Sequence, residues 1–147
     1  MKKKSSSRQM LLKVGVEFHG HLGPYLVLGL RMGATAVQML KPKGLHGLSA
    51  TVWTPILPPQ SCVLDGIQVS SGCTLGKENI RVRESKCTKA RFRSADRALN
   101  IEPTEKAMEL LSRISKDTRQ PDVQEIAIAL HQMPDRELFK CRQNRGR

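Results

Sequence analysis

The longest apolar stretch of the chain runs from Tyr25 to Leu40, and its pattern predicts a helix that is buried around most of its circumference. Its polar residues fall at i, i+4 and i+7 on one narrow stripe: Arg31, Thr35 and Gln38. Pro24 stands just before this stretch, at a position where proline favours the first turn of a helix. We therefore expect the core of the protein to form around this helix.

Apolar residues recur at helical spacing in other segments and alternate with polar residues in three short ones. The helical segments are residues 8–17, 61–70, 103–116 and 121–131, followed by a last turn at 134–139. The alternating segments are residues 45–57, 80–84 and 88–93, and we expect the last two to form an antiparallel pair that turns at residues 85–87. This order predicts an α+β fold, in which a small mixed or antiparallel sheet packs with helices in two layers.

The periodic segments follow one another without an internal repeat or a linker, so we expect a single core domain over residues 8–140. Basic residues crowd both ends, and we interpret residues 1–7 and 141–147 as basic tails. No apolar stretch reaches the roughly 20 residues of a membrane span, and no signal-peptide pattern follows the first lysines. We expect a cytoplasmic protein with no membrane partner.

The formal net charge is +12, from 25 basic and 13 acidic residues, so an anionic partner has to be considered. Six basic residues would line one face of the predicted strand pair: Arg81, Arg83, Lys86, Lys89, Arg91 and Arg93. The chain has one Trp, one Tyr and three Phe, too few to favour a base-stacking platform. We therefore prefer a solvated basic face to nucleic-acid binding, and keep a small anionic ligand as a candidate partner.

Two histidines and a cysteine point to a metal site. His19 and His21 stand at i and i+2 just before the buried helix. Cys62 stands in the first turn of the helix predicted from residue 61, where the helix dipole lowers the pKa of a thiol. Zinc binds imidazole and thiolate together, with iron as the alternative. Asp65 lies one turn after Cys62, where it could orient a histidine or act as a general base.

Cys73 and the loop around it allow more than one interpretation. At 1.5 Å per helical residue, Cys73 would lie about 15 Å from Cys62, too far to share one zinc ion unless the chain folds back or a second protomer supplies it. The loop Gly72–Lys77 resembles a phosphate-binding loop only faintly, because it lacks one residue between its glycines and is followed by Glu78. We reject a nucleotide site, and weigh an anion site at Lys77 against a simple turn.

Two motifs occur in order along the chain. The first is Phe18-His19-Gly20-His21-x-Gly23-Pro24 with Gly29-x-Arg31-Met32. The second is Cys62-x-x-Asp65-Gly66-Ile67-Gln68, followed by Ser71-Gly72-Cys73-Thr74-Leu75-Gly76-Lys77-x-Asn79. Together they resemble the signature of the E-subunit family of formylmethanofuran dehydrogenases, and the resemblance extends from about Arg8 to Phe139.

The resemblance implies an α+β core related in topology to the second domain of glyceraldehyde-3-phosphate dehydrogenases. It also implies a homodimer, a zinc-holding cleft lined by the His and Cys motifs, and a link to tungsten or molybdenum oxidoreductases that reduce carbon dioxide onto methanofuran. Two features depart from the family. Its members commonly have a cysteine where Gly23 stands, and many carry a C-terminal zinc ribbon, whereas a basic tail follows Phe139 and no CxxC pair occurs here.

We therefore predict His19, His21 and Cys62 as metal ligands, with Cys73 as a further candidate, in an accessory subunit or a carrier of metal or metallate. Arg31 is a charge inside an apolar helix and needs a partner, such as Asp65 or a substrate anion. Two alternatives from other classes stay open. One is an enzyme with Cys62 as its nucleophile and a histidine as base, and the other is a basic nucleic-acid-binding module.

Overall fold

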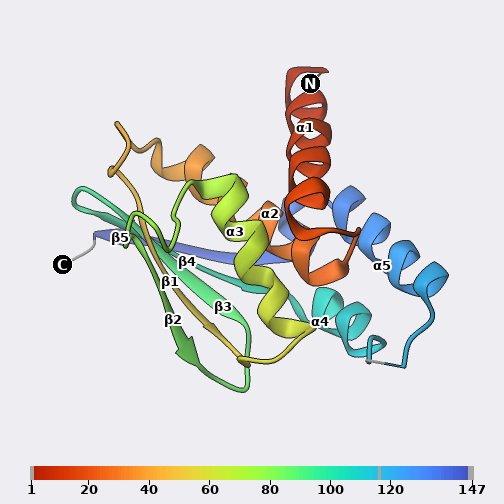
Figure 1. Ribbon diagram of the computed structural model, residues 1–147. Coiled ribbons are helices and arrows are strands. Elements are labelled where there is room, and N and C mark those ends of the chain that lie inside the picture. Colours follow the sequence, from red (N-terminus) through yellow and green to blue (C-terminus); the bar gives the residue numbers. More distant parts are fainter. Residues whose placement is uncertain (1, 116, 146–147) are drawn as a thin grey trace.

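The computed structural model describes residues 2–115 and 117–145, and shows one sheet with helices gathered on one of its faces (Figure 1). Its strands are β1 (Ser49–Thr54), β2 (Ile80–Glu84), β3 (Lys89–Ser94), β4 (Arg97–Pro103) and β5 (Phe139–Arg145). Their spatial order is β2-β1-β3-β4-β5. The β1–β2 pair is parallel and the other pairs are antiparallel. The fold is therefore α+β with a mixed sheet, which confirms the predicted class.

The helices surround one central helix. They are α1 (Lys2–His19), α2 (Pro24–Leu40), α3 (Val63–Ser71), α4 (Glu105–Ser112), α5 (Gln120–Gln132) and α6 (Asp135–Leu138), with a 3₁₀ turn, η1 (Gln60–Cys62), before α3. Most residues of α2 are buried, because it packs against the sheet, α1, α3 and α5. The apolar stretch thus forms the core helix that its pattern predicts. Among the described residues, no helix is long and apolar enough to cross a membrane.

Helices α2 and α3 cross with their backbones in close contact, and glycines on both helices make this possible. A Cβ atom on Gly29 would overlap the carbonyl oxygen of Val63, and one on Gly66 would overlap the carbonyl oxygen of Leu26. A Cβ atom on Gly33 would overlap the Ser70 hydroxyl. Because no side chain separates the two backbones, the N-terminal end of α3 lies beside the first turns of α2.

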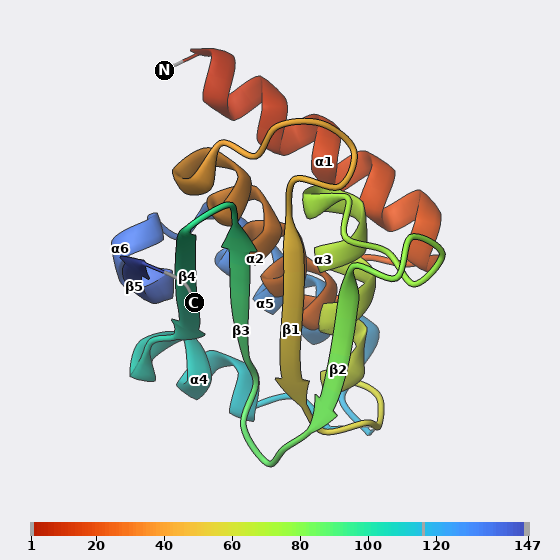
Figure 2. The ribbon, with the colours of Figure 1, turned by 90° about the vertical axis from the view of Figure 1, so that its left-hand side faces the viewer.

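The predicted antiparallel pair of residues 80–84 and 88–93 is wrong. Both segments are strands, β2 and β3, but β1 lies between them and pairs with each. The short connection between β2 and β3 therefore passes across the end of β1 instead of closing a hairpin (Figure 2). The alternating burial of β1 suits a central strand with two neighbours, but a sequence pattern does not show which strands those are.

Strands β4 and β5 were not predicted, and each for a physical reason. In β4 the buried residues do not alternate strictly, and a proline ends the strand. In β5 only Phe139 is buried, because this strand lies at the edge of the sheet, where charged side chains are typical. The segment interpreted as a C-terminal tail from residue 141 is therefore a strand as far as Arg145, and α1 likewise begins at Lys2 instead of after an N-terminal tail.

Candidate functional site

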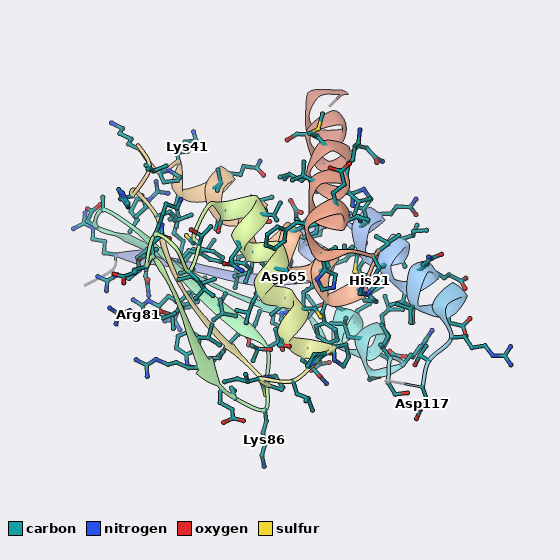
Figure 3. All side chains as sticks on the ribbon, in the orientation of Figure 1. His21, Lys41, Asp65, Arg81, Lys86 and Asp117 are labelled. Atoms are coloured by element: carbon teal, nitrogen blue, oxygen red, sulfur yellow. The ribbon has the colours of Figure 1, made fainter. Side chains whose placement is uncertain are left out.

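The histidine pair lies at the corner between α1 and α2. Helix α1 ends at His19, and Gly20 turns the chain with a positive φ of 103°. Gly23 then caps α2 in an extended conformation, followed by Pro24 in the first turn. Figure 3 labels His21 at this corner and Asp65 on α3. The α2–α3 crossing therefore brings the second motif to the first.

His19 has one ring nitrogen bonded and the other without a partner. Its Nδ1 lies 2.5 Å from Oδ2 of Asp65, a residue 46 positions further along the chain. Because a carboxylate can only accept, the Nδ1–H group donates this hydrogen bond to Asp65, and the tautomer that does so has its lone pair on Nε2. This Nε2 atom is buried and has no hydrogen-bond partner. Asp65 thus orients a histidine, one of the two roles that the sequence allowed for it.

His21 and Cys62 are the other two predicted ligands. The His19 and His21 rings are tilted by 38°, with their centroids 4.6 Å apart. Burial and the neighbouring His19 lower the pKa of His21, so its ring is neutral at pH 7. Burial and the Asp65 charge raise the pKa of the half-buried Cys62 thiol. The lowering expected from the helix N-terminus is therefore not found, and Cys62 is a protonated thiol at pH 7.

A pocket of about 230 Å³ has both histidines and Cys62 in its wall. Tyr25 and the Pro58–Pro59 pair line it as well, and Ser115 and Thr118 close it from the connection between α4 and α5. Sequence reasoning missed these last two residues. They are small polar residues in a loop about a hundred positions from the histidines, and no motif marks them.

The donors in this pocket do not form a closed metal site. Within residues 2–115 and 117–145, no group of three or more His, Cys, Asp or Glu side chains is arranged to hold a metal ion. The unpartnered Nε2 of His19, the neutral His21 ring and the Cys62 thiol nevertheless suit the chemistry of a zinc-type ligand set. The residues fit an open site in which His19 is already oriented.

Cys73 lies away from this pocket. It is fully buried in the core and its Sγ–H donates to the carbonyl of Leu48, with 3.5 Å between the heavy atoms. Burial raises the pKa of the Cys73 thiol, against smaller lowering effects of Ser71 and Lys77. The structure therefore does not bring Cys73 to His19, His21 and Cys62.

The loop that contains Lys77 uses its backbone N–H groups within the protein. The N–H of Cys73 donates to the Ser71 hydroxyl at 3.0 Å, and that of Thr74 donates to the side-chain oxygen of Asn79 at 2.8 Å. The N–H of Leu75 donates to the Gln68 side chain at 3.2 Å. These three groups are not available to an anion, so an anion site here would depend on the Lys77 ammonium group.

Arg31 is buried and its partners are not those expected. Its guanidinium donates to Asp135 at 2.6 Å and to the carbonyls of Leu130 and His131 at 2.8 and 3.0 Å. Arg8 also reaches Asp135, at 3.0 Å. Asp65, the suggested partner, instead binds His19. Arg31 therefore ties α2 to the end of α5 and to α6.

Comparison with known proteins adds two similar chains. A crystal structure of a protein from Syntrophus aciditrophicus, described as like the E subunit (FmdE) of a tungsten formylmethanofuran dehydrogenase, aligns with a TM-score of 0.67 and 19% identity. The alignment covers 95% of this chain and 73% of that one, and at this identity it shows a shared fold. A probable S-adenosyl-L-methionine-binding protein from Archaeoglobus fulgidus is 38% identical over 73 residues. That match covers 48% of this chain and only 19% of the relative, so this chain spans about a fifth of that protein's length.

The family comparison covers most of the chain. Residues 18–140 match the family described as FmdE, molybdenum formylmethanofuran dehydrogenase operon. The matched range includes both motifs, the α2–α3 crossing, strands β1 to β4 and the start of β5. The chain belongs to the FmdE family.

Proposed function

We propose that this FmdE protein binds a divalent metal ion, zinc in the first instance, through His19, His21 and Cys62. The observation that carries the proposal is the buried Nε2 atom of His19, which has no hydrogen-bond partner while Asp65 holds the opposite ring nitrogen. A buried polar atom without a partner is unfavourable, and binding a metal ion would remove that penalty. A carboxylate on the far nitrogen is also the usual support of a histidine ligand.

Each side chain has a distinct part in this site. Asp65 holds the tautomer of His19 and raises the basicity of its Nε2. His21 is neutral at pH 7 and needs no deprotonation before it binds. Cys62 is protonated and must release its proton when it becomes a ligand, so uptake of the ion is coupled to proton release. When bound, zinc would supply a Lewis acid beside this pocket.

The family supports a role beside a redox enzyme. Its description refers to a molybdenum formylmethanofuran dehydrogenase operon, and the solved neighbour is described as like one component of the tungsten enzyme. The proposed role is an accessory subunit, or a carrier of metal or metallate, for a tungsten or molybdenum oxidoreductase in the cytoplasm, working as a homodimer. Iron is the alternative metal.

The test is the metal content per chain of untagged protein, measured by elemental analysis. We expect about one zinc or iron ion per wild-type chain and its loss in His21→Ala and in Cys62→Ser. In a cobalt-loaded sample, the thiolate charge-transfer absorption should disappear in Cys62→Ser. The matched controls are His46→Ala and Cys87→Ser, which change an exposed histidine and an exposed cysteine outside the pocket and should keep the metal.

Two outcomes would contradict the metal site. If the controls lose the ion to the same extent, the metal is held elsewhere or without specificity. If wild-type protein is free of metal and does not take it up, while Cys62 reacts selectively with an alkylating reagent, the thiol-enzyme alternative is supported. A thiol enzyme would need a histidine base within hydrogen-bond reach of Cys62. Among the described residues no hydrogen bond joins Cys62 to a histidine, and His19 is bonded to Asp65 instead, so the metal site is the better supported of the two.

Gly23 offers a variant that should gain affinity. A Cβ atom on Gly23 would lie 3.2 Å from Nε2 of His21, and the backbone there is extended, with φ of −126°. A cysteine at this position, which members of the family commonly have, would thus lie beside His21. Gly23→Cys should bind zinc more tightly than wild type in a competition titration with a chelating dye, whereas Gly23→Ser should change the affinity much less. Equal affinity of all three proteins would place the ion away from His21.

A further inference from the structure

The face of the sheet turned away from the helices is open, and Figure 2 looks onto it. In β1 the buried side chains Ala50, Val52 and Thr54 point to the helices, so Thr51 and Trp53 point to the open face. Strand pairing carries this assignment across the whole sheet, because directly paired residues lie on the same face.

Seven basic side chains belong to this open face, and we call them the basic sheet face: Arg81, Arg83, Lys89, Arg91, Arg93, Lys140 and Arg142. Arg81 and Arg83 pair with Thr51 and Trp53 from one side of β1, and Arg91 and Lys89 pair with the same two residues from the other. Figure 3 shows Arg81 on the side of the sheet away from the helices. Glu102 is the one acidic side chain that the strand register adds to this face.

The basic residues form rows across the strands. One row runs Arg81, Thr51, Arg91, Asn100 and Arg142 through all five strands. Since neighbouring strands lie about 4.8 Å apart, successive arginines in this row are about 10 Å apart. Lys140 and Arg142 thus extend the cluster onto β5. The sequence pattern had predicted a basic tail from residue 141.

The charges of the basic sheet face are not neutralised within the protein. Among the described residues, none of the seven side chains takes part in an ion pair, although ion pairs occur on the helical side. Six of the seven are exposed and Arg91 is half-buried. Such a face attracts a polyanion, and it would repel the same face of a second copy.

One aromatic ring lies among these charges. Trp53 sits between Arg83 and Lys89 in a neighbouring row, and the Lys89 ammonium group lies 5.4 Å from its ring centroid. A hollow of about 350 Å³ on this face is bordered by Trp53, Asn100 and four of the basic residues, Lys89, Arg91, Lys140 and Arg142, with Glu102 as the one acidic residue in its lining. A ring in a basic hollow is the combination that holds an unstacked base beside its phosphates.

We propose that the basic sheet face binds single-stranded nucleic acid, with its arginines and lysines on the phosphates and Trp53 stacked on a base. A broad sheet does not fit a duplex groove, which admits a helix or a two-stranded ribbon, but it can support bases that are spread over its surface. A membrane surface is a poorer match, because the one large aromatic side chain of this face is half-buried beside Lys89.

The test uses the full chain and a labelled 20-nucleotide strand of mixed sequence, as RNA and as DNA, with fluorescence anisotropy over a series of salt concentrations. Wild type should bind the single strand more tightly than the matching duplex. In Arg81→Gln/Arg91→Gln/Arg142→Gln, the slope of log K against log salt should fall by about 2, because each phosphate contact contributes about 0.7. Lys13→Gln/Lys43→Gln/Arg136→Gln removes the same charge from exposed positions away from the face, and should keep the wild-type slope.

Trp53 provides a local readout, because it is the single tryptophan of the chain. The strand should quench its intrinsic fluorescence. Trp53→Ala should weaken binding about 5- to 150-fold, and Trp53→Phe should weaken it less because a ring remains.

Unchanged Trp53 fluorescence at saturating strand, or equal loss of affinity in the two triple variants, would overturn the proposal. So would tighter binding of the duplex, of polyglutamate or of phosphatidylserine vesicles than of the single strand.

Discussion

The buried arginine on the helical side of the sheet has partners within the protein, whereas the arginines on the open side have no ion-pair partner among the described residues. On the helical side Arg31 is 4% exposed, and an aspartate and two backbone carbonyls accept its N–H groups. On the open side Arg91 and its neighbours have no ion-pair partner among the described residues. A buried charge has to be matched by the fold itself, whereas an exposed one is left for solvent or for another molecule. Charge of the same sign therefore serves structure on one face and is available for recognition on the other.

The largest effect is expected where the two buried helices touch. Gly29→Ala would push a methyl group into the Val63 carbonyl, so α2 and α3 must separate. We expect the free energy of unfolding to fall by about 3 kcal/mol in a urea titration. The metal content should fall with it, because Cys62 and Asp65 move with α3. The control is Gly76→Ala, on a glycine with no heavy atom within 4 Å of its added Cβ, and an equal loss there would refute the close-packing argument.

An Arg→Met substitution on each side of the sheet tests whether an arginine stabilises the fold or is left free to bind another molecule. Arg31→Met should lower the free energy of unfolding by about 2 kcal/mol, because the buried carbonyl of Leu130 and the partly buried carbonyl of His131 lose their donor, while Asp135 keeps its ion pair with Arg8. Arg91→Met should change it by no more than about 0.5 kcal/mol, as is usual for a surface position. Urea titrations of both variants measure the difference. A loss at Arg91 as large as at Arg31 would mean that the open face is structural after all.

A smaller effect is expected at the histidine support. Asp65→Asn removes the charge that holds the tautomer of His19, and we expect about a tenfold loss of zinc affinity. The free energy of unfolding should change little, because Asp65 is 36% exposed. Asp96→Asn, in the exposed turn between β3 and β4, is the control. Unchanged affinity in Asp65→Asn would show that His19 is not a ligand.

The smallest effect concerns pH on the helical side. Burial, followed by the charges of Arg31 and Arg8, lowers the pKa of His131 below 6.5. The unfolded chain then binds a proton more readily than the folded one, so stability decreases as the pH falls below the unfolded pKa of about 6.5. Asp135, which binds both arginines, limits the size of the effect. His131→Gln should lose less stability than wild type between about pH 7.5 and about pH 5, and identical pH profiles would contradict this assignment.

The helices were predictable because their signals are local. Periodic apolar residues mark α2, and Gly72, in the left-handed conformation, ends α3 close to where the sequence placed it. The strands were harder, because β1 separates β2 from β3 and the polar edge strand β5 has the composition of a tail.

The sequence predicted most of the residues of the candidate site, but only in part which of them lie together in space. The motifs indicated His19, His21, Cys62 and Asp65, and the structure places all four around one corner of α2. It does not place Cys73 there, and it pairs Arg31 with Asp135, more than a hundred residues away. A residue's long-range partner depends on the completed packing, which a single sequence does not encode in any local pattern.

The distance in sequence between Arg31 and its partners has a consequence for biosynthesis. Leu130 lies 99 residues after Arg31 in the sequence, and Asp135 lies 104 residues after it. At a translation rate of about 5–20 residues per second, about 5–20 s pass on the ribosome before these acceptors exist. During that time α2 cannot be enclosed without leaving an unmatched cation inside the nascent chain. The core helix is therefore made early but can reach its final packing only after Asp135 has been synthesised.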